Sequence, residues 1–216
     1  MVSLVFKSFA VENFADLGSG DGSLLHSLLA SGYLAKASNV TAVDISQERI
    51  NNVSRIDSRI KCFQADICNL KMINDESMDF VVSSQVIEHI PDQEKFISEA
   101  HRILRKNGIF YLSTVFKKWY AWYFYRSNGR WVLDPTHVRE YQDTCELLGI
   151  VRRRGFEVLQ DKKTLQWFPV TDFFLKRICF KNDARRAYKN RLLSAARKIK
   201  VPIPGYYNWE MLLKKN

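Results

Sequence analysis

The chain has 216 residues, with 33 Lys and Arg against 23 Asp and Glu and a formal net charge of +10. That length suits one α/β domain with a buried core and excludes two full enzyme domains. The 4 cysteines form no C-x-x-C pair, and no stretch approaches the roughly 18 apolar residues of a membrane-spanning helix, so we expect free thiols, a cytoplasmic protein and no transmembrane segment.

The first informative segment is an apolar run at residues 13–17 that leads into alternate glycines at Gly18, Gly20 and Gly22. Glycines at this spacing permit backbone angles closed to other residues and let a ligand approach the peptide groups. Residues 23–30 then carry leucines at helical spacing. A helix that begins after such a turn presents N–H groups and its positive dipole end to an anionic group. The pattern predicts a strand, a ligand-binding turn and a helix.

A second apolar run ends in Asp44, 24 residues beyond Gly20. A carboxylate at this point of a nucleotide-binding α/β sheet binds ribose hydroxyls, so the two segments predict a ligand that contains a nucleoside. Dinucleotide-binding turns follow G-x-G-x-x-G and would need a glycine at position 23, where this chain has Ser23. A nicotinamide-dependent oxidoreductase is therefore disfavoured.

The first half of the chain alternates strand and helix patterns, which favours a parallel sheet covered by helices on both faces. Strands are expected at residues 13–17, 40–44, 60–64, 79–83 and 108–115, with helices at 23–30, after Ser46 and at 92–104. Ligands of such sheets lie outside the carboxyl ends of the strands, where the strand order reverses. Five candidate residues fall at these ends: Asp16, Gly18, Asp44, Asp66 and Ser84.

Five motifs occupy the first 115 residues in order. Residues 16–22 read D-x-G-x-G-x-G, residues 40–44 end in an acid, and residues 62–67, 78–92 and 106–113 read CFQADI, MDFVVSSQVIEHIPD and KNGIFYLS. Together they resemble the class I S-adenosylmethionine-dependent methyltransferases, in particular the small-molecule, type 11 branch that includes ubiquinone methyltransferases. The resemblance implies an α/β, doubly wound, Rossmann-like and mostly parallel seven-stranded sheet whose last strand is antiparallel. It also implies S-adenosyl-L-methionine as the cofactor.

The same resemblance assigns the cofactor contacts. The turn at Gly18 would contact the methionine part through its backbone, with Asp16 near the amino group. Asp44 would bind the ribose hydroxyls, or alternatively only cap its strand. Asp66 would accept a hydrogen bond from the adenine amino group, or alternatively be an exposed loop acid. The predicted cofactor residues are Asp16, Gly18, Ser19, Gly20, Asp44, Ile45, Asp66, Ile67 and Ser84.

Three residues are candidates for catalysis: His137, His89 and Glu88. Methyl transfer from a sulfonium is an in-line displacement, so positioning, at roughly 7–11 kcal/mol, should outweigh a general base, at roughly 3–5 kcal/mol. His89 and Glu88 follow the fourth strand at the expected mouth of the site; the pair could also bind a divalent metal or only organise the loop. His137 resembles part of a segment that lines the acceptor side in related enzymes, and its alternative is a structural hydrogen bond. No metal ligand is assigned.

The second half of the chain is strongly basic: residues 116–216 carry a net charge of +13, against −3 for residues 1–115. Such asymmetry suggests an anionic substrate, nucleic acid or lipid surface, unless it is only a solvated helix face. We expect one domain over residues 1–216, with an aromatic-basic insertion at 116–136 and a basic helical insertion at 164–204 before the final strand. Both insertions are expected to close the acceptor pocket.

The leading hypothesis is an enzyme that moves a methyl group from S-adenosylmethionine to an O, N or C atom of a small or lipid-like acceptor, an anionic or membrane-borne one included. The fourth strand leads into Ser83-Ser-Gln-Val rather than the Asn/Asp-Pro-Pro-Tyr-like motif of the amino-methylating nucleic-acid branch. An RNA methyltransferase, supported by the basic half, is the alternative. A non-catalytic S-adenosylmethionine-binding regulatory partner is the alternative of another class.

Overall fold

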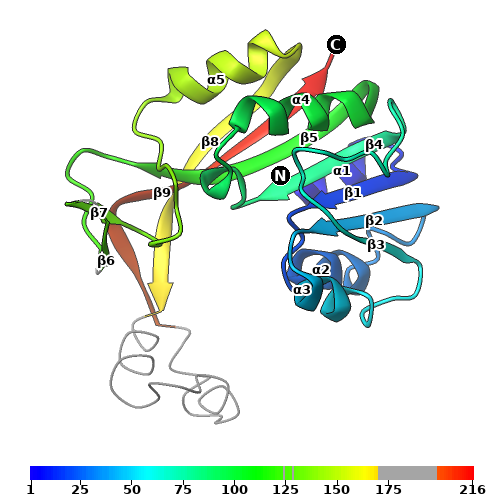
Figure 1. Cartoon of the computed structure of the whole chain (residues 1–216), viewed down its shortest axis with the longest axis horizontal. Helices are drawn as coiled ribbons and strands as arrows, with labels where there is room; N and C mark the ends of the chain where they lie inside the picture. The colour runs from blue at the N-terminus through cyan, green and yellow to red at the C-terminus, as the bar shows by residue number, and fades with distance from the viewer. Residues whose placement is uncertain (124, 128, 170–198) are drawn as a thin grey trace.

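A seven-stranded sheet forms the middle of the molecule in the computed structural model, which describes residues 1–123, 125–127, 129–169 and 199–216. Its strands are β1 (Asn13–Leu17), β2 (Asn39–Asp44), β3 (Ile60–Gln64), β4 (Met78–Ser84), β5 (Leu104–Lys117), β8 (Phe156–Pro169) and β9 (Lys200–Lys215). They run in the order β3-β2-β1-β4-β5-β9-β8 (Figure 1). β9 is antiparallel to β5 and β8, and the other neighbours are parallel. The predicted doubly wound, Rossmann-like sheet with an antiparallel last strand is confirmed.

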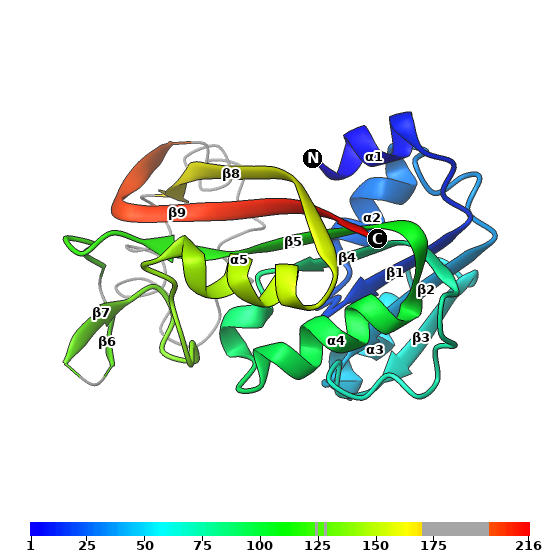
Figure 2. The same cartoon turned by 90° about the horizontal axis from the view of Figure 1, so that it is seen from above.

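Helices cover both faces of this sheet (Figure 2). Their bounds are α1 (Val2–Ser8), α2 (Ser23–Ala30), α3 (Gln47–Val53), α4 (Gln93–Ile103) and α5 (Thr144–Arg153). The apolar faces of α4 and α5 pack into one core cluster, and α1 and α2 pack into the cluster on the other face. Side chains cap three of these helices: Ser46 accepts from the N–H of Arg49, Asp92 from that of Lys95, and Asp143 from that of Cys145.

The helix α1 is not predicted by the sequence, in which the first strand starts too early to leave much room before it. Val5 is buried, and the ring of Phe6 lies 5.7 Å from that of Phe14 and 5.4 Å from that of Phe80. Phe14 and Phe80 lie on the neighbouring strands β1 and β4. A single short helix is therefore enough to cover this part of the sheet.

The β8–β9 hairpin is longer than expected. Its pairing continues to Pro169 opposite Lys200, so residues 164–169 and 200–204 belong to strands and not to the insertion predicted at 164–204. Those bounds were wrong because Pro202 and Pro204 were expected to end the insertion, whereas both lie within β9. The helical part expected for this insertion falls mainly on residues 170–198, which lie outside the described residues.

The aromatic-basic insertion packs against this hairpin. Ala121 and Tyr123 form a small buried cluster with Val115, Ile203 and Tyr206. Beyond them, β6 (Tyr125–Ser127) and β7 (Arg130–Val132) form a separate two-stranded sheet. Trp119 is 89% exposed. The insertion thus has an inner side that is part of the core and an outer side that meets solvent.

Three cysteines of the described chain, Cys62, Cys68 and Cys145, are free thiols, as expected. Among the residues whose structure is described, no helix is both long and apolar enough to cross a membrane.

Candidate functional site

A cavity of about 890 Å³ opens at the carboxyl ends of β1, β2 and β4, beside the point where the strand order reverses. It is lined by the glycine turn, the ends of β2 and β4, the segment after β3 and the start of α4. All nine residues predicted for the cofactor line it: Asp16, Gly18, Ser19, Gly20, Asp44, Ile45, Asp66, Ile67 and Ser84. Segments scattered over 70 residues of sequence therefore meet at one place, as the topology requires.

The glycine turn needs two of its glycines for steric reasons. Gly18 has φ +76°, and a Cβ there would lie 2.4 Å from Cγ2 of Val86. Gly22 has φ +77°, and a Cβ there would lie 2.4 Å from Cδ1 of Ile56. Residues with a side chain rarely adopt φ angles of this kind, and neither Val86 nor Ile56 leaves room for a Cβ atom. The turn therefore brings the backbone itself to the wall of the cavity.

The N–H groups of Gly18, Ser19 and Gly20 already donate hydrogen bonds within the protein, contrary to the expectation that the turn presents them to an anionic group. Gly18 and Ser19 donate to the carbonyl oxygen of Val43 at 2.8 and 3.0 Å, and Gly20 donates to Oδ2 of Asp44 at 2.9 Å. A cradle for phosphate needs free N–H groups. This turn instead presents carboxylates to the ligand, which suits a positively charged group.

Asp16 supplies one of those carboxylates. It is 3% exposed, and its Oδ2 has no hydrogen-bond partner. Burial, and then repulsion from Asp44, raise the pKa of Asp16 to about 7. A buried carboxylate without a partner is costly, and a bound cation would remove that cost. Asp16 is therefore poised to accept an ammonium group.

Asp44 holds the turn and the next helix together. Besides Gly20, it accepts from the N–H of Ser46 at 2.9 Å, and Arg49 lies 3.9 Å from its Oδ2. The alternative of a strand-end cap thus describes part of what Asp44 does. Each carboxylate oxygen has two lone pairs, so one on each stays available for ribose hydroxyls.

The outer part of the cavity has an apolar wall. Ile45 is 71% exposed although it lines the cavity, whereas Ile67 is buried beneath. Asp66 is exposed at the same edge and accepts from the N–H of Cys68 at 2.8 Å. An exposed isoleucine beside a carboxylate is a suitable place for an aromatic ring that carries an amino group.

The lining residues that the sequence reasoning missed include Arg49, Gln85 and Lys95. Arg49 and Lys95 lie in the first turns of α3 and α4, where the helix dipole disfavours a cation, and that position was a usable signal. Gln85 follows β4 with φ +56° and donates to Oδ1 of Asn208 at 2.9 Å. Its backbone angle could not be predicted, because it depends on this contact with β9.

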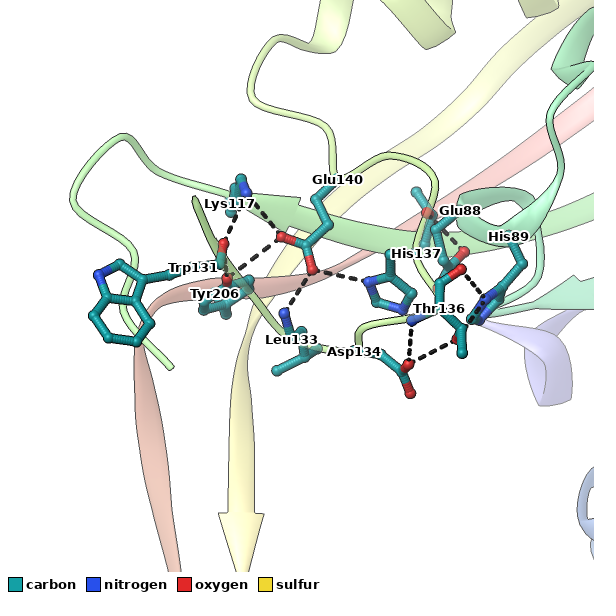
Figure 3. A network of polar contacts seen from close by, with 11 residues as sticks. Glu88, His89, Lys117, Trp131, Leu133, Asp134, Thr136, His137, Glu140 and Tyr206 are labelled. Atoms are coloured by element: carbon teal, nitrogen blue, oxygen red, sulfur yellow. Dashed lines mark hydrogen bonds and ion pairs between the residues drawn. The ribbon is translucent and has the colours of Figure 1, made fainter. Parts of the chain in front are cut away.

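The three candidate catalytic residues meet at one edge of the cavity. The 3-10 helix η1 (Ile87–His89) carries Glu88 and His89, and the loop after β7 carries His137 (Figure 3). The two histidine rings lie 4.8 Å apart at 70°. His89 lines the cavity, whereas Glu88 is fully buried and the side chain of His137 is 6% exposed. Burial and the adjacent His137 lower the pKa of His89, so its ring is neutral near pH 7.

His137 is oriented by a buried ion-pair network. Oε1 of Glu140 lies 2.8 Å from Nδ1 of His137, and Oε2 lies 2.9 Å from Nζ of Lys117 (Figure 3). Burial alone would raise the pKa of Glu140, but hydrogen bonds from His137, Lys117 and the N–H of Leu133 outweigh it and lower this pKa. An ionised Glu140 can only accept a hydrogen bond, so Nδ1 of His137 carries the proton. Nε2 of His137 then keeps its lone pair.

The predicted closure of the pocket by the insertions does not hold for the part of the chain that the structure describes. Of the described residues of the 116–136 insertion, only Thr136 lines the cavity. The cluster around Tyr123 and Tyr206 draws the insertion onto β9 instead. His89 of η1 and Thr136 therefore form the described part of the cavity wall at this edge.

Sequence comparison agrees with this geometry. The family described as "Methyltransferase domain" matches residues 15–112. A probable S-adenosylmethionine-dependent methyltransferase of Mycolicibacterium smegmatis is 34% identical over 56% of this chain and 45% of its own length. A ubiquinone biosynthesis O-methyltransferase of Bartonella quintana is 24% identical over 73% of this chain and 64% of its own length. The chain thus spans about half to two thirds of the curated relatives it matches.

Structural comparison extends over nearly the whole chain. An S-adenosylmethionine-dependent methyltransferase of Mesorhizobium loti has a TM-score of 0.61 and 19% identity, with 98% of this chain and 96% of that chain covered. A [4+2]-cyclase has a TM-score of 0.64 and 18% identity, with 99% and 79% covered. Likeness at this identity establishes the fold, and the cyclase illustrates that the fold alone does not determine the reaction.

Proposed function

We propose that this chain, which carries a class I S-adenosylmethionine-dependent methyltransferase domain, transfers a methyl group to a hydroxyl oxygen of a small or lipid-like acceptor. S-adenosylmethionine is the cofactor of this domain, and the observation that carries the proposal is the unpartnered, buried Asp16 beside a turn whose N–H groups are used. A ligand that presents an ammonium group there, ribose hydroxyls at Asp44 and an adenine at Ile45 matches each part of the cavity. A phosphate-bearing nucleotide does not match, because its charge would face two carboxylates.

The reaction is a displacement at the methyl carbon. The acceptor oxygen forms a bond to that carbon while the carbon–sulfur bond breaks, its electron pair stays on sulfur, and the hydroxyl proton leaves to a base. The products are a methyl ether and the neutral thioether. His89 faces the cavity with a lowered pKa, so its neutral ring takes the role of proton acceptor.

The size and the charges of the cavity support a small acceptor. A volume of about 890 Å³ lies in the upper part of the roughly 300–1,000 Å³ range of ligand sites, so a nucleoside cofactor and a small second molecule fit together. Lys95 and Arg49 at its wall favour an acceptor with a negative group. The relatives named as ubiquinone biosynthesis O-methyltransferases favour oxygen over nitrogen or carbon.

Transfer of label from methyl-labelled S-adenosylmethionine tests the proposal. Incubation of the protein with fractionated small metabolites, lipids, RNA and protein should place the label in a small-molecule or lipid fraction, as a methyl ether by mass spectrometry. Label in RNA would replace the proposal with the RNA methyltransferase. Cofactor binding without turnover on any fraction would favour the non-catalytic binding partner.

The role of the histidines is tested in the same assay. His89→Ala and His137→Ala, which remove two rings that lie 4.8 Å apart, should each lower turnover at least tenfold while the affinity for S-adenosylmethionine, measured by calorimetry, changes less than twofold. Full activity of either variant would remove that histidine from the reaction. Glu48→Gln, at an exposed position in α3, serves as a control that leaves both quantities unchanged.

A further inference from the structure

The cluster of Glu88, His89 and His137 has the composition of a metal site. One ligand atom of each residue lies within 4.8 Å of the other two. A tetrahedral ion with bonds of about 2.1 Å holds its ligands about 3.4 Å apart. The three ligand atoms would therefore have to move closer together around an ion, and His89, which is half-buried on the cavity wall, is the ligand nearest to open space.

The buried carboxylate of Glu88 is independent evidence for a ligand at this place. It is fully buried, and Thr114 donates its hydroxyl to Oε2 at 2.9 Å. Oε1 is buried as well and has no hydrogen-bond partner. An unsatisfied buried acceptor of this kind costs about 1–3 kcal/mol, more when it is charged, and structures retain it where it serves a ligand.

Both histidines have their lone pairs set for coordination. Nδ1 of His89 lies 3.3 Å from the carbonyl oxygen of Thr136, which can only accept, so Nδ1 carries the proton and Nε2 the lone pair. Nδ1 of His137 donates to Glu140 in the same way. Histidines that bind a metal in proteins usually donate their other ring N–H to a carboxylate or carbonyl oxygen, which orients the ring.

We propose that Glu88, His89 and His137 bind one divalent transition-metal ion of the zinc type at the acceptor edge of the cavity. Two imidazoles and one carboxylate suit Zn²⁺ or a similar first-row ion better than Mg²⁺ or Ca²⁺, which prefer oxygen ligands only. Three protein ligands leave a coordination position open. The ion deepens the proposed function, on which this part rests: it would bind the acceptor hydroxyl oxygen and favour loss of its proton to solvent before attack on the methyl carbon. His89, as a ligand of the ion, would then not be the proton acceptor.

Metal binding is measured without turnover. The full chain, freed of metal with a chelator, is titrated with Zn²⁺ by calorimetry, and Co²⁺ is added separately to record its visible absorption. We expect one equivalent to bind, and we expect Glu88→Gln, His89→Ala and His137→Ala each to weaken binding at least tenfold. Glu88→Gln preserves size and the bond from Thr114, so it keeps the test valid if the histidine variants unfold.

Two controls separate this site from adventitious binding. His26→Ala removes an exposed histidine, and Cys145→Ser removes an exposed thiol, and neither should change the affinity. Absence of stoichiometric binding, or binding that survives all three substitutions at the site, overturns the proposal. S-adenosylmethionine affinity and label transfer are measured on the same samples. Normal turnover of the metal-free protein would overturn the role of the ion and leave the proposed methyl transfer intact. Metal binding without any turnover would overturn the proposed methyl transfer and leave the metal site intact.

Discussion

Oδ2 of Asp44 accepts the N–H of Gly20 at 2.9 Å, so the acid that ends β2 fixes the turn that follows β1. The proposed cofactor site is thus held together by a hydrogen bond between the two motifs that predict it. Asp44→Ala removes this bond and the one from Ser46. We expect a loss of about 1–3 kcal/mol in the free energy of unfolding and at least tenfold weaker binding of S-adenosylmethionine. Urea denaturation and calorimetry measure the two effects, and unchanged affinity would remove Asp44 from the ribose contact.

Asp16→Asn should stabilise the unliganded protein and weaken cofactor binding. The pKa of Asp16 is near 3.8 when unfolded and about 7 when folded, so the folded state holds an extra proton between these values. The contribution of Asp16 to stability therefore falls as pH rises from about 4 to about 7 and is constant above that range. Asparagine should remove this slope and add about 1–3 kcal/mol at pH 8. Thermal unfolding at several pH values checks it, and an unchanged slope would contradict the assignment.

The same carboxyl gives the pH dependence of cofactor binding. An ammonium group beside Asp16 favours its ionised form, so the complex holds fewer protons than the free protein near neutral pH. Affinity for S-adenosylmethionine should rise with pH up to about 7 and then level off, with release of a proton on binding at pH 6. Calorimetry in buffers of different ionisation enthalpy measures that proton. Binding without proton release at pH 6 would place the amino group elsewhere.

Gly18→Ala and Gly20→Ala form a matched pair on one turn. Both residues have positive φ, which costs an alanine about 1–2 kcal/mol. Only at Gly18 does the new Cβ meet a neighbour, Val86, and overpacking adds about 1–3 kcal/mol. Val86→Ala should recover that second part in the double variant. Equal destabilisation of the two single variants in urea would contradict the close contact.

Five strands of the sheet and three of the five described helices followed from local patterns, because glycine spacing, strand-end acids and helical periodicity are properties of short segments. The cofactor residues followed from the family resemblance that these patterns carry. What the sequence missed depends on distant contacts. Lys117 belongs to the aromatic-basic insertion that was expected to close the pocket, yet it is buried against Glu140. Glu140 received no role, because its four partners come from three separate segments. The unsatisfied oxygen of Glu88 is likewise a property of packing alone.

Glu140→Gln should have two separate effects: it destabilises the protein through Lys117, and it slows the reaction through His137. The side chains of Lys117 and Glu140 are 9% and 2% exposed, so glutamine leaves a buried ammonium group without its counter-ion, at a cost of about 3–5 kcal/mol. Lys117→Met alone should cost less, since Glu140 keeps its bonds from His137 and Leu133. The double variant should regain much of the stability yet remain slow, because no carboxylate then orients His137. Urea denaturation and label transfer on the three variants separate the two effects, and a double variant with full turnover would show that His137 needs no carboxylate partner.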